Sequence, residues 1–318
     1  MGVTGALRDA SARLRAEAGR VLVGPLDLVD QLLLAMVCGG HVLLEGVPGT
    51  AKTLLAKTVA RLTDARFARV QFTPDLLPAD VIGTVVYNQA SAAFEVRRGP
   101  LFSDIVLADE VNRSPARTQA ALLEAMEERQ VTLDNQRHPL GDRFMVLATQ
   151  NPIEYEGTYP LPEAQLDRFL LKLEVPYLPV ADEVELARRV AEGFDPHDLD
   201  RLAPPVIDAV ALAALRREVG AVRVADEVLA YAVAIVDATR HAPDLGLGAS
   251  PRGTVGLVRL GKARAALAGR DFCQPEDVKG IAVAALRHRV LRRPEAEIQG
   301  VGEVQAIERV LAQVPVPR

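Results

Sequence analysis

The chain has no tryptophan and few aromatic residues of any kind. Phe, Tyr and Trp together make up 4% of its 318 residues. Proteins that bind single-stranded nucleic acid stack bases on aromatic side chains, so this scarcity argues against such a surface. A basic excess is also missing, because 37 Lys and Arg stand against 42 Asp and Glu, a formal net charge of −5. Neither property favours a nucleic-acid-binding protein, although both are compatible with a local basic patch.

Cysteine is nearly absent, and long apolar runs are absent. Cys38 and Cys273 lie far apart and without the spacing of metal ligands, so we expect buried free thiols in a reducing compartment. No apolar run approaches the roughly 20 residues of a membrane span. Residues 1–20 mix Arg, Asp, Glu and Ala, unlike the apolar core of a signal peptide. We therefore expect a cytoplasmic protein without membrane insertion.

Short apolar runs alternate with helical patterns up to about Val175. The runs predict five buried strands, at His41–Glu45, Phe67–Phe72, Ile105–Ala108, Phe144–Thr149 and Leu170–Val175. Helical patterns lie between them, notably Thr53–Leu62 and Ala116–Arg129. This alternation predicts an α/β fold, a parallel five-stranded sheet sandwiched by helices.

Two segments interrupt the alternation and predict β-hairpin inserts. Val85–Tyr87 and Phe94–Val96 flank a stretch of small and polar residues. Val131–Leu133 and His138–Leu140 flank a polar turn in the same way. Paired β-rich runs around such a turn are typical of hairpins.

Pro176 and Pro179 predict a domain boundary, because proline favours extended backbone in the residue before it. We expect an N-terminal helix over residues 1–20, an α/β nucleotide-binding domain over 21–175, a linker over 176–180 and a smaller all-helical lid domain over 181–318. Five helices are predicted in the lid, at Asp182–Glu192, Val206–Val219, Asp226–His241, Arg252–Ala268 and Pro275–Arg293.

The strongest motif follows the first predicted strand and precedes a helical pattern. It consists of Gly46, Val47, Pro48, Gly49, Thr50, Ala51, Lys52 and Thr53. Backbone N–H groups of such a turn, with the helix N-terminus behind it, bind phosphate oxygens. We predict an ATP-binding P-loop in which Lys52 contacts the β- and γ-phosphates and Thr53 coordinates Mg²⁺. Glycine is usual at the position of Ala51, and alanine is tolerable there if the backbone keeps helical dihedrals.

Asp109 and Glu110 end the third predicted strand. Ligand crevices lie at the carboxyl ends of parallel strands, so this pair should face the phosphate loop. We assign Asp109 to Mg²⁺ and Glu110 to the attacking water, the two tasks that hydrolysis gives to carboxylates. Asn151 follows the fourth strand. It would lie beside the γ-phosphate, or it belongs to a turn, since Asn-Pro commonly begins one.

These motifs belong to longer segments that resemble one family throughout. The segments are Gly40–Thr53 (GHVLLEGVPGTAKT), Gln71–Thr84 (QFTPDLLPADVIGT), Gly99–Thr132 and Phe144–Phe169. In them the chain resembles the AAA+ ATPases and, among these, the MoxR family, whose phosphate loop also has the alanine. The likeness extends from about Val21 to the C-terminus.

The resemblance implies roles that spacing alone does not give. Asn151 matches sensor 1, and Arg168 matches the arginine finger that reaches the ATP of a neighbouring subunit. Arg252 matches sensor 2 on the helical lid, where it would clamp the phosphates. Val23 and Gly24 match the stretch beside the adenine. The two predicted hairpins match the helix-2 insert and the pre-sensor 1 insert of the family.

The resemblance also implies assembly and partners. Family members form homo-oligomeric rings, usually hexamers, and hydrolyse ATP with Mg²⁺. They remodel or mature protein clients in a chaperone-like manner, including proteins that await metal-cofactor insertion, and often act with a von Willebrand factor A partner.

Two other functions are compatible with parts of the sequence. A nucleic-acid-acting or chelatase-like AAA+ motor shares the helix-2 insert, but the acidic balance and scarce aromatics argue against it. A non-hydrolysing switch is the second, and the joint presence of Lys52, Glu110 and Arg168 argues against it. Arg113 and Arg117 follow the acidic pair and could also face a subunit interface.

Overall fold

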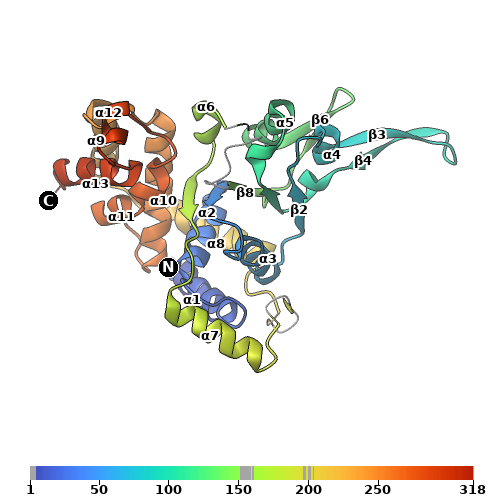
Figure 1. The fold of residues 1–318 in the computed structure, drawn as a ribbon, viewed down its shortest axis with the longest axis horizontal. Helices are drawn as coiled ribbons and strands as arrows, with labels where there is room; N and C mark the ends of the chain where they lie inside the picture. Colours follow the sequence, from blue (N-terminus) through green and yellow to red (C-terminus); the bar gives the residue numbers. More distant parts are fainter. Residues whose placement is uncertain are drawn as a thin grey trace.

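The computed structural model describes residues 5–150, 159, 161–195, 198–199, 202 and 204–317. Its centre is a five-stranded sheet in which every neighbouring pair of strands is parallel (Figure 1). Across the sheet the strands are β2 (Phe67–Gln71), β5 (Ile105–Asp109), β8 (Met145–Gln150), β1 (Val42–Glu45) and β9 (Leu171–Glu174). The five strands and their parallel sheet, predicted from the apolar runs, are confirmed.

Alternating residues of the inner strands enter two different cores. Leu44, Leu107 and Leu147 pack on one sheet face into a large core that includes α2 (Asp27–Val37) and α3 (Lys52–Leu62). Their chain neighbours Leu43, Val106 and Val146 pack on the other face with α5 (Ala116–Glu128). Both faces of β5 and β8 are buried, which explains why these strands are continuously apolar in sequence.

Two antiparallel hairpins extend from this domain, as predicted. The first pairs β3 (Gly83–Asn88) with β4 (Ala93–Arg98) and follows the short helix α4 (Pro78–Ile82). It projects away from the sheet (Figure 1), and every residue of β4 is exposed. The second pairs β6 (Gln130–Leu133) with β7 (Gln136–Pro139) directly after α5.

The C-terminal part is mostly helical. Its helices are α7 (Val180–Ala191), α8 (Ala209–Ala221), α9 (Asp226–His241), α10 (Pro251–Leu267), α11 (Pro275–Leu286), α12 (Pro294–Ile298) and α13 (Glu303–Gln313). The predicted single helix Pro275–Arg293 is wrong beyond Leu286. There β11 (Leu291–Arg292) pairs antiparallel with β10 (Leu245–Leu247), and the lid is not entirely helical. Pro294 favours extended backbone at the residue before it, and Arg293 is extended, with φ of −76° and ψ of 150°.

The N-terminal helix α1 (Ala6–Ala18) joins the two parts of the molecule. It contacts α2 and α3 of the sheet domain and α8 and α10 of the C-terminal part. Leu7 and Leu14 on this helix are fully buried in the large core, which continues from the sheet into the C-terminal helices. Among the helices that the structure describes, none combines the length and apolar character needed to cross a membrane.

Candidate functional site

A cavity of about 700 Å³ lies at the carboxyl ends of β1, β5 and β8. It is lined by residues 21–25, Leu28, Gly46, residues 48–55, Arg69, Asp109, Glu110, Thr149, Gln150, residues 175–178, Glu183 and Leu186. The structure thus brings the predicted phosphate loop, the acidic pair and the Val23-Gly24 stretch to one cavity. Of the predicted loop residues, Val47 alone is not part of this lining, although its backbone carbonyl takes part in the loop.

The Lys52 ammonium lies inside the curve of the phosphate loop. Its Nζ donates hydrogen bonds of 2.7 Å to the carbonyls of Gly46 and Val47 and one of 3.3 Å to Thr50 Oγ1. Burial lowers the pKa of Lys52 below its usual value, and the nearby carboxylates oppose this shift. The cation is therefore held by weak neutral acceptors that a phosphate would replace.

Two glycines shape the loop around this position. A Cβ at Gly46 would lie 2.4 Å from the carbonyl oxygen of Val175, so the close approach of the residue that follows β9 requires glycine. Gly49 has φ of +84° and open space where a Cβ would point, which leaves room for a ligand to approach the backbone. This cradle at the N-terminus of α3 fits a triphosphate.

Ala51 departs from the expectation derived from sequence. Its φ of 61° and ψ of 22° place it in the left-handed region at the start of α3, so the expected helical dihedrals are wrong. The Cβ of a non-glycine residue crowds the following carbonyl in this region, at a cost of about 1–2 kcal/mol. The glycine that usually stands here is the residue without that cost.

Another part of the cavity lining is largely apolar. Val23 and Gly24 line it together with Tyr177 and Leu178 of the predicted linker and Leu186 of α7. A Cβ at Gly24, whose φ is +110°, would lie 2.5 Å from the side chain of Leu178. The linker and α7 therefore pack on the N-terminal stretch, and together they line this part of the cavity. The sequence indicated a linker here but gave no sign that it lines a site.

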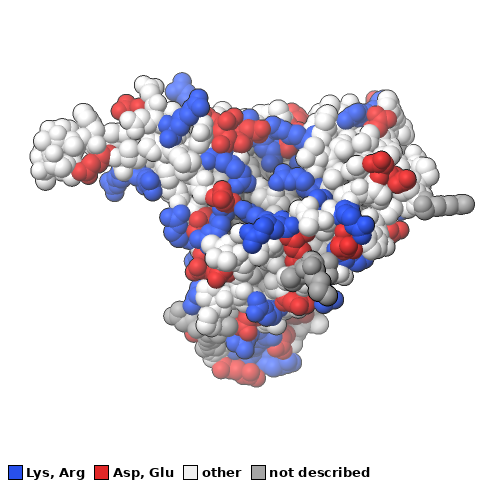
Figure 2. Space-filling model, turned by 180° about the vertical axis from the view of Figure 1, so that it is seen from behind, with Lys and Arg blue, Asp and Glu red and all other residues white. Residues whose placement is uncertain are grey.

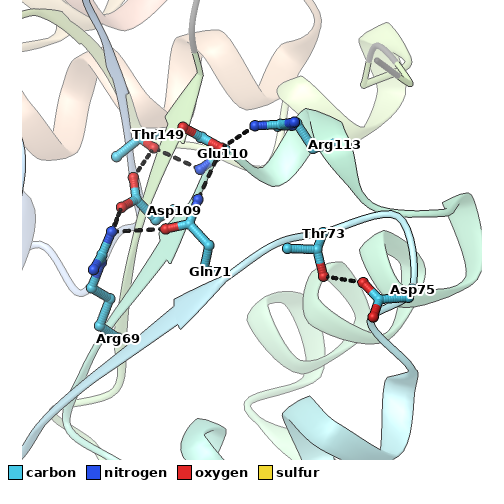
Figure 3. Close-up of polar contacts among 8 residues, drawn as sticks. All are labelled: Arg69, Gln71, Thr73, Asp75, Asp109, Glu110, Arg113 and Thr149. Atoms are coloured by element: carbon cyan, nitrogen blue, oxygen red, sulfur yellow. Dashed lines mark hydrogen bonds and ion pairs between the residues drawn. The ribbon is translucent and has the colours of Figure 1, made fainter. Parts of the chain in front are cut away.

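Asp109 is held by two donors on neighbouring strands (Figure 3). Arg69 of β2 donates to Asp109 Oδ2 from Nη2 at 2.6 Å and from Nε at 3.0 Å, while Thr149 Oγ1 donates to Oδ1 at 2.6 Å. Oxygen ligands of this kind suit Mg²⁺, and Thr53 lines the same cavity. The oxygens of Asp109 and Thr53 fit the predicted Mg²⁺, and the guanidinium of Arg69 forms an ion pair with Asp109. Arg69 was missed in the sequence, where only its place on a predicted strand was visible.

Glu110 is fixed through both its backbone and its carboxylate (Figure 3). Its backbone is left-handed, with φ of 55° and ψ of 49°, and its N–H donates to Thr149 Oγ1 at 2.8 Å. Gln71 Nε2 and Arg113 Nη1 donate to Glu110 Oε2 at 2.9 and 3.1 Å. Arg113, hypothesised to face an interface, thus contacts the predicted catalytic carboxylate of its own subunit. The contacts of Gln71 and Thr149 were also missed.

Arg168 and Arg252 lie outside the lining of this cavity. Both contact Glu127 near the end of α5: Arg168 Nε lies 3.5 Å from Glu127 Oε2, and Arg252 Nη2 donates to Glu127 Oε1. The expected clamp of Arg252 on the phosphates of its own subunit is therefore absent from the described arrangement. Arg117 is exposed on α5, and Asn151 lies outside the described residues.

Comparison with known proteins defines the class to which this fold and site belong. Residues 41–171 match the ATPase family associated with various cellular activities (AAA), and residues 237–310 match the AAA lid domain. A crystal structure from Cytophaga hutchinsonii, described as a candidate ATPase, superposes with a TM-score of 0.90 at 43% identity and covers 98% of this chain and 96% of its own. The molecule is an AAA-type ATPase in fold.

Full-length relatives narrow the class to a family. Chaperone MoxR1 of Mycobacterium tuberculosis is 40% identical over 95% of this chain and 81% of its own length. Protein MoxR of Methylorubrum extorquens is 32% identical over 98% of this chain and 96% of its own. YeaC, an uncharacterized protein of Bacillus subtilis, is 45% identical over 94% of this chain and 92% of its own. The chain belongs to the MoxR family of AAA+ ATPases.

Proposed function

We propose that the chain hydrolyses ATP to ADP and phosphate with Mg²⁺ in the cavity at the carboxyl end of the sheet. The observation that carries the proposal is that one cavity combines Lys52 in a glycine-rich loop with Asp109 and Glu110 at the end of β5. Thr53 and Asp109 would hold Mg²⁺, which supplies charge neutralisation on the phosphates when bound. Val23 and Gly24 would lie beside the adenine.

The residues of the chain have separate tasks in this reaction. Lys52 exchanges its loop carbonyls for phosphate oxygens, a stronger charge-assisted contact. Glu110, oriented by its contacts with Gln71 and Arg113, accepts a hydrogen bond from the attacking water. Asn151 would orient the same water.

Arg168 and Arg252 would act on the ATP of a neighbouring subunit. Their position outside their own cavity supports this role, since a guanidinium must reach the phosphates to stabilise the transition state. Such an arginine contributes roughly 10³–10⁵ in rate. Hydrolysis then requires a ring of identical subunits, which we propose to be a hexamer.

Substitution at the cavity tests the reaction. Lys52→Ala should abolish ATP binding in calorimetry, and Glu110→Gln should bind Mg-ATP but lower turnover at least a hundredfold, because it removes the carboxylate that activates water. Glu124→Gln, an exposed carboxylate on α5, is the control and should match the parent. Full turnover by Glu110→Gln would remove this assignment.

Mixing two inactive variants tests action between subunits. A Lys52→Ala subunit still offers Arg168, and an Arg168→Ala subunit still has an intact phosphate loop. If the arginine acts on a neighbour, the mixture should recover a measurable fraction of the parent rate although each variant alone is inactive. No recovery at any mixing ratio would contradict the shared site.

We further propose that turnover serves chaperone-like remodelling of protein clients, including metal-cofactor insertion and work with a von Willebrand factor A partner. Chaperone MoxR1 is a full-length relative, and the projecting β3–β4 hairpin exposes Tyr87 and Phe94, with exposed fractions of 54% and 74%, as an apolar contact for protein. The Glu110→Gln chain held in ATP should retain such a client in a pull-down.

One observation favours testing a nucleic-acid-acting or chelatase-like motor beside this function. On the face shown in Figure 2, Lys and Arg side chains gather over the middle of the molecule, interspersed with Asp and Glu. The ATPase rate with and without DNA, across salt concentrations, distinguishes the two. A DNA-stimulated rate that falls steeply with salt would favour the motor.

A further inference from the structure

Glu127, in the last turn of α5, contacts both arginines that lie outside the cavity. One of its carboxylate oxygens accepts a hydrogen bond from Arg252 Nη2, and the other lies 3.5 Å from Arg168 Nε. All three side chains are partly open to solvent, with exposed fractions of 35% for Glu127, 48% for Arg252 and 30% for Arg168. A single carboxylate therefore separates two guanidiniums at the surface.

Other contacts hold the side chain of Arg168 and the backbone of Arg252. Arg168 Nη1 donates to the Leu123 carbonyl at 2.6 Å. Ser250 accepts a hydrogen bond of 3.1 Å from the backbone N–H of Arg252 and donates one of 2.7 Å to Asp167. This side-chain bond links the segment of Arg168 to the N-terminus of α10, so the backbones that carry the two arginines stay joined without help from the shared carboxylate.

Positive charge exceeds negative charge in this cluster. Asp167, the neighbouring carboxylate, already lies 3.3 Å from the buried guanidinium of Arg289. Arg168 Nε is buried and makes no hydrogen bond with any residue that the structure describes. Guanidiniums bind oxyanions through their forked N–H donors. The cluster can therefore accept an oxyanion with more charge than one carboxylate.

We propose that Glu127 is a resident anion that occupies Arg168 and Arg252 in the separate subunit, and that the γ-phosphate of ATP in a neighbouring subunit competes with it. This inference rests on the proposed function, in which both arginines act on a neighbour. When two subunits associate, Arg168 and Arg252 exchange their contact with Glu127 for one with the γ-phosphate, because the triphosphate carries more negative charge than one carboxylate. ADP has no γ-phosphate and leaves them on Glu127. Assembly is thereby tied to ATP rather than to ADP.

Removal of the carboxylate should strengthen assembly in ATP, because the competitor is lost while the contacts to Leu123 and Ser250 persist. Partly exposed ion pairs contribute little each. We therefore expect Glu127→Gln to lower the protein concentration at half-assembly about two- to tenfold in Mg-ATP. In Mg-ADP the same substitution should change this concentration by less than about twofold, since no γ-phosphate competes.

Sedimentation velocity of the full chain measures this concentration. The parent carries Glu110→Gln so that ATP persists during the run, and Glu127→Gln is added to it. Glu124→Gln is the matched control, since Glu124 is an exposed carboxylate one turn earlier on α5, and it should behave as the parent. Glu127→Asp keeps the charge on a shorter side chain and should fall between the parent and Glu127→Gln.

The outcomes separate this inference from the proposed function. The resident-anion proposal is wrong if Glu127→Gln does not lower the protein concentration at half-assembly in Mg-ATP. It is also wrong if the substitution changes this concentration equally in Mg-ATP and Mg-ADP. If Arg168→Ala abolishes ATP-dependent assembly in the same experiments, the proposed site shared between subunits is still supported, even where the resident-anion proposal is wrong. If the parent stays monomeric in Mg-ATP, or if Arg168→Ala assembles as the parent does, the shared site fails and the resident anion fails with it.

Discussion

Thr149 is the residue that holds the two site carboxylates in their relative positions. Its hydroxyl is fully buried between the strands, donating to Asp109 Oδ1 at 2.6 Å and accepting the N–H of Glu110 at 2.8 Å. A hydroxyl can do both at once, because it carries one donor and two acceptor lone pairs. Since Glu110 has a left-handed backbone, this hydrogen bond also stabilises an unfavourable conformation at the place where water would be activated.

Thr149→Val should therefore damage both stability and turnover. Valine has nearly the same shape but leaves the Glu110 N–H without its acceptor, so we expect the free energy of unfolding in urea to fall by about 1–3 kcal/mol. We also expect kcat to fall roughly tenfold, the effect of about 1.4 kcal/mol on the barrier. Thr149→Ser keeps the hydroxyl and serves as the control. Equal unfolding free energies and equal kcat values for Thr149→Val and Thr149→Ser would show that the hydroxyl is dispensable.

The left-handed Ala51 gives a second prediction at this scale. Ala51→Gly removes strain of about 1–2 kcal/mol, and the greater freedom of glycine in the unfolded chain offsets about 0.4–1 kcal/mol of it. The nucleotide-free protein should become more stable by about 0.5–1 kcal/mol in urea unfolding. Ala56→Gly, in the interior of α3, should destabilise instead, because glycine is unfavourable there. Destabilisation by both substitutions would contradict the strain.

At the scale of elements, the C-terminal end of α2 is where several helices meet. Arg129 after α5, Arg216 of α8 and Arg259 of α10 all donate to backbone carbonyls in the Met36–Gly39 segment. The charge of the Asp142 carboxylate also acts on two of these guanidiniums, those of Arg129 and Arg216, and favours their charged forms. They are favoured by the negative end of the helix dipole but repel one another. This repulsion, together with burial as the larger cause, lowers the pKa of Arg129 and of Arg216.

Mutual repulsion makes a distinct prediction for a double-mutant cycle. Each single change, Arg129→Gln or Arg259→Gln, loses hydrogen bonds but relieves the repulsion. Each single variant already removes the whole repulsion between Arg129 and Arg259, so the double variant gains no second relief from it. The loss of unfolding free energy in the double variant should exceed the sum of the single losses by about 0.5–1 kcal/mol. Added salt should shrink this excess by screening. Additive or smaller losses in low salt would contradict the repulsion.

Elements with a strong local pattern could be predicted from the sequence, and contacts between elements could not. The five strands, the two hairpins and α9 (Asp226–His241) follow from apolar runs, turn residues and helical periodicity. The end of α11 was misplaced because β11 gains its hydrogen bonds from β10, about 45 residues earlier in the chain. In the candidate site, motifs predicted Lys52 and Asp109, which line the same cavity. Arg69 was missed because its role depends on strand order, which places β2 beside β5.

At the scale of the whole molecule, two buried histidines lie where separate parts meet. His41 precedes β1, accepts the N–H of Val146 of β8 at 2.9 Å on Nδ1, and contacts the Met126 carbonyl of α5 at 3.2 Å through Nε2. His288, after α11, contacts the Phe169 carbonyl beside β9 at 2.8 Å through Nε2. The ring of His41 must be neutral, because its Nδ1 accepts a hydrogen bond.

Burial, aided by nearby arginines, lowers the pKa of both histidines to about 3. The unfolded chain binds protons at these rings below pH 6.5, whereas the folded chain does not until the pH approaches 3. Stability from this source is therefore complete above pH 6.5 and falls as the pH is lowered through that window. Between pH 7 and pH 5 each histidine should cost about 2 kcal/mol of unfolding free energy.

Urea unfolding at pH 7, 6 and 5 measures this loss, and His41→Gln isolates one histidine. The variant should be less stable at pH 7, since it loses a fitted ring, but its stability should decline less steeply towards pH 5 by about 1 kcal/mol per pH unit. His241→Gln is the control for removing an imidazole at the surface, because that ring is exposed at the end of α9, 3.7 Å from Asp237. NMR adds an independent reading, since the Cε1–H resonances of His41 and His288 should stay unshifted from pH 8 to pH 5. A titration of either ring near pH 6.5 would show that water reaches the packed regions around His41 and His288. These histidines would then not link folding to pH.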